Sequence, residues 1–320
     1  MQPIMPRETI IAIGAGVVSA LLSIVATFGS GLGLLLAYFA LLPIIIIGLS
    51  QGHRTATFAT LSGMFSAILL SNIYQGMLYC ISIALPAWLI VLTALIPQTT
   101  NNTSSQLIPI GEIISRLAVL GGIFVVISSI IFFDKPGDLP HTIEVFLNKL
   151  ITHNRPNLNI TTNHRLLVEQ MVPLFPAIAV SSWLLMSVIN TMIAQAILIK
   201  ADLNLIPAFQ YSKITAPEWL YWALVSSGVI VLTGSGTFEY VGRNLAIIFL
   251  IPFLFTGLGV IHTAARQFRS PVIALIIFYF FTIILSWPAF IAILLGFFER
   301  WTNFRQKFLP TIPKDKSKLE

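Results

Sequence analysis

The chain has 320 residues, of which 56% are hydrophobic and 9% are charged, and its formal net charge is +6. Soluble domains carry about 25% charged residues, so this composition excludes a water-exposed domain of ordinary size and indicates a membrane protein. Excess Lys and Arg is typical of cytoplasmic loop ends in membrane proteins, and we therefore expect no nucleic-acid partner. The single cysteine, Cys80, excludes an intramolecular disulfide and a cysteine-based zinc site.

Apolar segments recur along the whole chain and predict an all-α fold, a polytopic transmembrane helix bundle of about eight or nine spans. A span needs about 20 apolar residues to cross a hydrocarbon core of about 30 Å. Gly29-Ser30-Gly31 separates the first two runs as a tight turn, and Pro86 predicts a kink in the fourth. The expected spans are 9–28, 32–49, 57–70, 74–96, 113–133, 172–199, 219–234, 242–266 and 272–298.

A charged segment at 134–171 divides the spans into two sets. Within it, apolar residues recur at helical spacing and predict a short amphipathic helix lying on the membrane; they are Ile143, Leu147, Leu150 and Ile151. The expected parts are an N-terminal five-span membrane bundle (1–133), an outer loop (134–171), a C-terminal membrane bundle (172–300) and a basic cytoplasmic tail (301–320).

The distribution of Lys and Arg predicts the orientation. Placing the N-terminus in the cytoplasm puts Arg54, Lys200 and Arg266 there as well, as the positive-inside rule requires. Nine simple crossings would leave the basic tail outside. Either the last run folds back at Trp287-Pro288, or the short run 57–70 does not cross. We expect eight effective crossings of a bacterial inner membrane, with both chain ends in the cytoplasm.

Two polar stripes inside the apolar runs are candidates for a ligand site. Polar groups within a span face a partner or a cavity, because contact with lipid is costly. An amide and an aromatic ring on facing helices could hold a small, largely uncharged ligand. The same groups could instead only join helices by hydrogen bonds. The residues are Trp183, Ser187, Asn190 and Gln195 on the sixth span and Asn72, Gln75 and Tyr79 on the fourth.

Two further features have alternative interpretations. Ala12, Gly16 and Ala20 form a small-xxx-small row on the first span, which lets another helix approach closely. That helix could belong to this chain or to another protein. His262 and Arg266 lie near the inner end of the eighth span and could form a gate or a proton relay, or could simply stabilise a helix end.

The sequence offers no arrangement that favours an enzyme. Asp residues occur only in loops and the tail, so an intramembrane aspartyl pair is absent, and there is no phosphate-binding loop. His141, His153 and His164 share the outer loop without the spacing of metal ligands. We therefore expect no catalytic residues, no metal and no cofactor.

Three stretches carry a family resemblance that covers most of the chain. They read LLAYFALLPIIIIGLSQGHRTA, GRNLAIIFLIPFLFTGLGVIH and WPAFIAILLGFFERWTNFR, and the most specific pieces are Asn244-Leu245-Ala246 and Gly257-Leu258-Gly259-Val260-Ile261-His262. Here the chain resembles the YybS-like family of bacterial membrane proteins, which is distantly similar to the S components of energy-coupling-factor vitamin transporters.

The resemblance implies a six-helix, S-component-like core followed by extra C-terminal helices. S components dock on a transmembrane coupling subunit through small residues of their first helix, which Ala12, Gly16 and Ala20 match, and their ATPases are separate chains. We therefore expect a small-molecule binding or transport subunit without its own ATPase. The alternative is a non-transporting membrane scaffold or assembly factor, in which the polar stripes only join helices.

Overall fold

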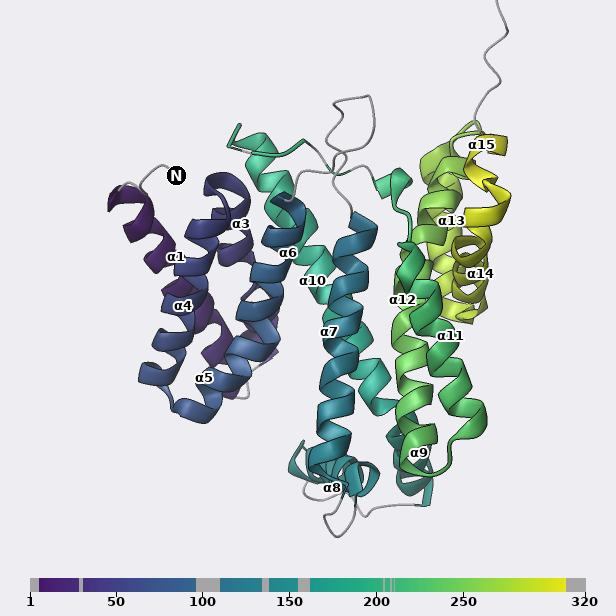
Figure 1. Cartoon of the computed structure of the whole chain (residues 1–320), viewed down its shortest axis with the longest axis horizontal. Helices are drawn as coiled ribbons and strands as arrows, with labels where there is room; N and C mark the ends of the chain where they lie inside the picture. Colours follow the sequence, from purple (N-terminus) through teal and green to yellow (C-terminus); the bar gives the residue numbers. More distant parts are fainter. Residues whose placement is uncertain are drawn as a thin grey trace, which may run out of the picture.

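The apolar runs form helices that pass repeatedly between two ends of the molecule (Figure 1). In the following, the upper end is the one where α1, α4 and α7 begin and where α10, α12 and α14 end. The computed structural model describes residues 6–28, 31–95, 110–133, 138–154, 162–203, 205–207, 209 and 211–308. The α-helices are α1 (Pro6–Ile24), α2 (Gly31–Tyr38), α3 (Leu42–Gln51), α4 (His53–Leu70), α5 (Ile73–Tyr79), α6 (Leu85–Leu95), α7 (Ile110–Ile131), α8 (Asp138–Asn154), α9 (Thr162–Met171), α10 (Phe175–Lys200), α11 (Glu218–Thr233), α12 (Thr237–Ala265), α13 (Pro271–Leu285), α14 (Trp287–Thr302) and α15 (Phe304–Phe308).

The predicted all-α polytopic bundle is confirmed. Within the described part of the chain, six helical segments are long and apolar enough to cross a membrane: Arg7–Thr27, Gly31–Gln51, Ile73–Leu95, Ile110–Ile131, Arg165–Lys200 and Thr237–Ala265. By the same measure there are up to seven if α13 and α14 are counted as one span, so the predicted number of eight or nine is not confirmed.

The last apolar run breaks where the sequence indicated. α13 ends at Leu285 and α14 begins at Trp287, and the chain bends by 116° between them. Ser286 at the bend adopts a positive φ of 56°. The chain therefore turns back at Trp287-Pro288 rather than continuing as one straight span.

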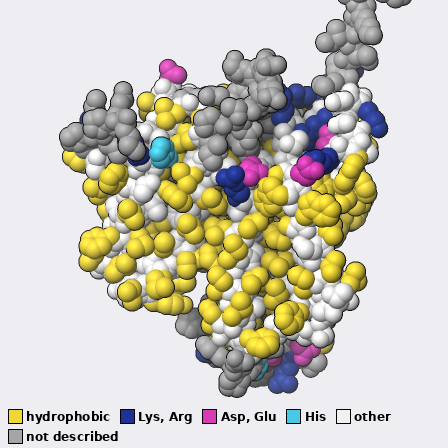
Figure 2. Space-filling view, viewed as in Figure 1, with side chains coloured by type: hydrophobic (Ala, Val, Ile, Leu, Met, Phe, Trp, Pro, Cys, Tyr) yellow, Lys and Arg dark blue, Asp and Glu magenta, His cyan; other side chains and the backbone are white. Residues whose placement is uncertain are grey.

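Helices α1–α6 form one group, α7 with α11–α15 form a second, and α10 crosses between them (Figure 1). Fully buried apolar side chains include Leu41 and Ile45 in the first group, Leu117 and Phe253 in the second, and Leu184 on α10. Hydrophobic side chains cover the middle of the face shown in Figure 2, and charged side chains gather toward its two ends. This distribution is that of a bundle with its middle in lipid.

The predicted amphipathic helix is α8, at the lower end. Its apolar face packs on protein, because Leu139, Ile143 and Leu147 are buried against Val168 of α9 and Tyr240 of α12. The side chains of Leu150, Ile151, His153 and His164 lie outside the described part of the chain, and so does the tail beyond Phe308.

Candidate functional site

The second span is interrupted between α2 and α3, and the interruption follows from Pro43. Proline has no N–H, so it cannot donate to the Phe39 carbonyl four residues earlier. The Leu42 N–H donates to that carbonyl instead, at 3.0 Å. In a continuous helix, the Leu42 N–H would have donated to the Tyr38 carbonyl. At the break, that carbonyl therefore loses its donor inside the bundle.

Side chains from distant helices supply the missing donors at this break. Asn190 on α10 donates from Nδ2 to the Tyr38 carbonyl at 2.8 Å. Ser19 on α1 donates to the Ala40 carbonyl at 2.6 Å, and the Tyr79 hydroxyl on α5 donates to the Ser19 hydroxyl at 2.8 Å. Asn190 and Ser19 are fully buried. Two of the predicted ligand residues, Asn190 and Tyr79, thus hold the α2–α3 break closed.

A second break lies in the fourth span and is filled in the same way. Residues Cys80–Ala84 form a π-helical turn between α5 and α6, just before Pro86. Pro86 cannot donate to the Ser82 carbonyl four residues earlier. The Trp183 indole Nε1–H of α10 donates to that carbonyl at 2.7 Å. Trp183 is therefore the one predicted ligand residue of the sixth span that binds the fourth span directly.

Two buried amides hold the ends of α10. At the upper end, Gln195 donates from Nε2 to the Pro207 carbonyl at 3.0 Å and accepts from the Phe209 N–H at 2.9 Å. At the lower end, Asn244 of α12 accepts from the Ala177 N–H at 2.8 Å and donates to the Pro173 carbonyl at 3.0 Å. The first N–H groups of a helix have no partner within it, so Asn244 acts as a cap from outside.

The remaining residues of the two stripes do not join these contacts. Ser187 donates within its own helix to the Trp183 carbonyl at 2.9 Å. Asn72 is exposed and caps α5 by accepting from the Gln75 N–H at 2.9 Å. The structure therefore distributes the predicted ligand residues over several backbone gaps and does not gather them around one cavity. Asn190 Oδ1 is buried and has no hydrogen-bond partner within the described chain.

The small-residue row of the first span faces α4. Ala12, Gly16 and Ala20 are buried, and a methyl group added at Gly16 would collide with the Ala59 carbonyl oxygen and the Ser62 hydroxyl. The row thus allows the backbones of α1 and α4 to touch. A coupling subunit could reach it only by displacing α4.

His262 and Arg266 lie together at the upper end of α12 without contacting each other. His262 Nδ1 lies 2.8 Å from the Leu258 carbonyl, and since a carbonyl only accepts, this contact places a hydrogen on Nδ1. The imidazole centroid is 6.0 Å from the ring of Tyr279 on α13. Arg266 is exposed.

A partly buried arginine, Arg305, was not singled out by the sequence analysis and lies on α15. Arg305 of α15 donates to the Thr256 carbonyl at 3.0 Å and to the Ile214 carbonyl, and its Nε lies 3.4 Å from Glu299 Oε1. Burial lowers the pKa of the Arg305 guanidinium, and the Glu299 carboxylate partly offsets that effect. These contacts tie α15 to α12 and to the segment before α11.

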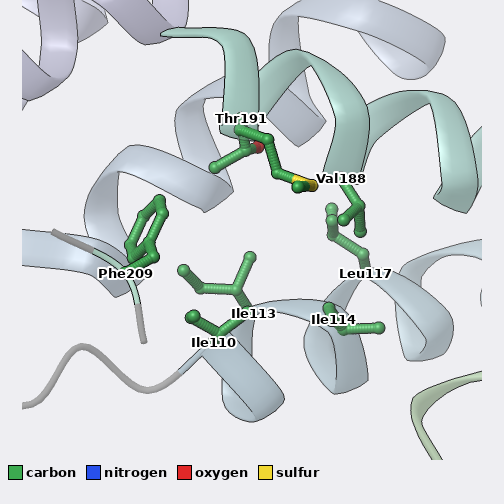
Figure 3. A pocket seen from close by; sticks show the side chains of 8 residues that line it. Ile110, Ile113, Ile114, Leu117, Val188, Thr191 and Phe209 are labelled. Carbon is green, nitrogen blue, oxygen red and sulfur yellow. The ribbon is translucent and has the colours of Figure 1, made fainter. Parts of the chain in front are cut away.

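Among the described residues we consider three hollows, and none of these three contains the predicted stripes as a set. The smallest, shown in Figure 3, lies between α7 and α10 and has a volume of about 10 Å³. It is lined by Ile113, Leu117, Val188 and Phe209 among others, and Thr191 turns its hydroxyl to the Ser187 carbonyl. A space of this size holds at most one water molecule.

Two larger hollows lie at the lower end, and Thr237, the first residue of α12, lines both of them. One is an apolar groove of about 510 Å³ between α7, α11 and α12, with Ile130, Phe133, Phe238, Val241 and Leu245 in its wall. The other has a volume of about 370 Å³ and includes Glu239, Tyr240 and Arg243 of α12. Glu239 and Arg243 form an ion pair one helical turn apart. Both volumes fall within the usual range for small-molecule sites, about 300–1,000 Å³.

Comparison with protein families places the chain in one of them. A family model described as a predicted membrane protein (DUF2232) matches residues 17–299. The chain belongs to this family. The match runs from the first span to the end of α14 and so includes both groups of helices. Neither the search of curated proteins nor the search of solved structures gave a significant match. The family model supports neither the YybS-like name nor a likeness to S components.

Proposed function

We propose that this protein is a membrane-embedded binding or transport subunit for an amphipathic molecule with a long apolar chain. The observation that carries the proposal is that an apolar groove and a more polar hollow share Thr237 in their walls. The apolar groove would take the chain, and the hollow beside it, with Glu239 and Arg243, would take the polar head. Because Glu239 and Arg243 already form an ion pair, an uncharged or zwitterionic head suits this hollow better than a strong acid.

The position of the groove along the helices supports an amphipathic ligand. It is lined by the last residues of α7 and the first turns of α12, which are the parts of those helices closest to the lower end. Apolar chains belong in the hydrocarbon core and polar heads at its edge. This ligand class differs from the compact, largely uncharged molecule that the polar stripes indicated.

The proposed setting is a bacterial inner membrane with the upper end in the cytoplasm. Lys and Arg of the described chain concentrate at that end, as the positive-inside rule requires. Ten lie on helix ends and loops there: Arg7, Arg54, Arg116, Lys200, Lys213, Arg266, Arg269, Arg300, Arg305 and Lys307, against Lys149, Arg165 and Arg243 at the lower end. Both ends of the described chain then face the cytoplasm after eight crossings. Transport driven by ATP would need a separate coupling subunit and ATPases, because the sequence has no phosphate-binding loop.

The groove can be tested by filling it. Ile130 lines the groove and is 68% exposed, so Ile130→Trp should fold while blocking the apolar chain. Ile127 lies one turn earlier on α7, is 47% exposed and is not part of the groove, so Ile127→Trp is the matched control. The protein would be reconstituted in vesicles containing a phospholipid with a diazirine in its acyl chain, irradiated, and analysed by peptide mass spectrometry.

We expect labelling of α7 and α12 peptides in the native protein and in Ile127→Trp, and background labelling in Ile130→Trp. Equal labelling of all three proteins would mean that the groove is ordinary lipid-facing surface and would overturn the proposal. If the labelling supports the groove, native mass spectrometry of the purified protein would identify any amphiphile that remains bound.

A second function, a non-transporting scaffold, is favoured by a different observation. Trp183, Asn190 and Gln195 all bind backbone groups of this chain, so the α10 stripe stabilises helices whether or not a ligand binds. If so, Asn190→Leu lowers the melting temperature and leaves lipid labelling unchanged. Loss of labelling in Asn190→Leu at a temperature where it is folded would instead connect the stripe to ligand binding.

A further inference from the structure

Helix α13 is shorter than a membrane span, and the chain turns back where it ends. α13 has 15 residues and is therefore about 22 Å long, which is shorter than the core of about 30 Å. It starts near the upper end, just after α12, and the chain turns back by 116° at Ser286 (Figure 1). The irregular backbone of Leu285, Ser286 and Trp287 is thus placed at membrane depth.

Several backbone carbonyls at this tip have no hydrogen-bond donor within the described chain. Two hydrogen bonds cross it: the Ser286 N–H donates to the Thr282 carbonyl and the Ala289 N–H donates to the Ser286 carbonyl, both at 3.1 Å. Pro288 has no N–H to offer. Within the described chain, no donor reaches the carbonyls of Ile283, Ile284 and Leu285.

The tip also has unused donors, and it is uncovered. The Ser286 hydroxyl and the Trp287 indole N–H make no hydrogen bond with the described chain. Ile283 is 82% exposed and Trp287 is 54% exposed. None of the side chains of α13 is buried. In a bilayer, irregular backbone is tolerated only where it is buried in protein or lines a water-filled cavity.

We propose that the α13–α14 tip is covered by the same tip of a second copy of this chain. The argument is complementarity: one short loop carries both the orphan carbonyls and the unused donors. Two such loops related by a two-fold axis can satisfy each other, which is what an isologous contact requires. The exposed apolar side chains of α13 flank the tip, so they would pack against the partner copy around these hydrogen bonds.

Cysteine cross-linking in native membranes tests this contact directly. Cys80 is the only cysteine, so Cys80→Ser gives a background in which Ser286→Cys is unique. Leu61→Cys in the same background is the control, because Leu61 is 57% exposed on α4, away from the tip. After mild oxidation, we expect Ser286→Cys to form a disulfide dimer of twice the chain mass and Leu61→Cys to remain monomeric.

A second variant tests the hydrogen bonds. Trp287→Phe keeps an aromatic ring, although a smaller one, and removes the indole N–H once in each copy. It should weaken the dimer roughly tenfold when dissociation is followed by single-molecule photobleaching in vesicles. Cross-linking of Ser286→Cys to another protein, identified by mass, would overturn the second copy as the occupant. Absence of any cross-link in folded protein would overturn the proposal.

Discussion

Two helix breaks in this chain are alike in cause and opposite in outcome. Pro43 opens the second span and Pro288 follows the bend of the last one, and each leaves carbonyls without donors. At the first break, Ser19 and Asn190 supply donors from α1 and α10. At the second, the described chain supplies none. The comparison teaches that a break inside a membrane bundle becomes part of the scaffold when the chain fills it, and an interaction site when it does not.

The largest expected effect comes from separating the helices that fill the first break. Gly16→Leu would drive α1 away from the α4 backbone and carry Ser19 away from Ala40. Backbone overlap of this kind should lower the free energy of unfolding by about 3 kcal/mol or more, measured by SDS titration in mixed micelles. Gly14→Leu is the control, because nothing lies within 4 Å of a Cβ added at Gly14, and it should be nearly neutral. Equal stability of the two variants would contradict the close contact of α1 with α4.

Removing one donor from the filled break should have a smaller effect. Asn190→Leu leaves the Tyr38 carbonyl unpaired in the bundle, which should cost about 1–3 kcal/mol of unfolding free energy. Ser187→Ala, one turn away on the same helix, loses a bond only within its own helix and should change stability by less than about 0.5 kcal/mol. Thermal unfolding followed by size-exclusion fluorescence would compare them, and similar losses in both would mean that Asn190 does not support the break.

The same substitution, Trp to Phe, can be made at Trp183, which fills a break, and at Trp287, which lies at the uncovered tip. Trp183→Phe removes the donor that replaces the missing Pro86 N–H, so unfolding free energy should fall by about 0.6–1.7 kcal/mol, the range measured for hydrogen bonds between membrane helices. The measurement is the same SDS titration as for Gly16→Leu.

The smallest expected effect is that of Trp287→Phe on the isolated monomer. Trp287 Nε1 bonds to nothing in the described chain, so monomer unfolding free energy should change by less than about 0.5 kcal/mol. Dilute detergent solution, where any dimer dissociates, is the condition for this titration. A loss as large as that of Trp183→Phe would show that the tip has an intramolecular partner and would remove the difference between the tip and the breaks that the chain fills.

Apolar run length was enough to predict most of the fold. The predicted runs 113–133, 172–199 and 219–234 correspond to α7, α10 and α11 within a few residues, because span length is set by bilayer thickness. The basic tail and Trp287-Pro288 together indicated the turn at the end of the chain as one of two alternatives, the other being that the run 57–70 does not cross. The angle of the bend and the choice of neighbouring helices depend on packing between segments, which no single segment encodes.

The role of the polar residues could be predicted only in part. The sequence placed Asn190 and Trp183 toward the bundle interior, because lipid excludes their polar groups. It could not tell a ligand from a backbone carbonyl as their partner, since both accept the same hydrogen bond. Pro43 and Pro86 could have helped to predict these partners, because each proline marks a carbonyl four residues earlier that loses its donor. For Pro86, that carbonyl is the one that Trp183 binds. The hydrogen bonds of Ser19 and Asn244 to other segments were not predicted, because a lone serine or asparagine in an apolar run does not indicate its partner.

The bond between Asn190 and Tyr38 spans 152 residues, and this separation sets an order of events during synthesis. At about 5–20 residues per second, the ribosome delivers Asn190 roughly 8 to 30 seconds after Tyr38. Ser19 is made before Ala40, so their hydrogen bond can form almost at once. The Tyr38 carbonyl gains its donor only after the sixth span has entered the membrane. The nascent N-terminal helices therefore pass through a half-closed state, which is completed only when a segment encoded much later in the message arrives.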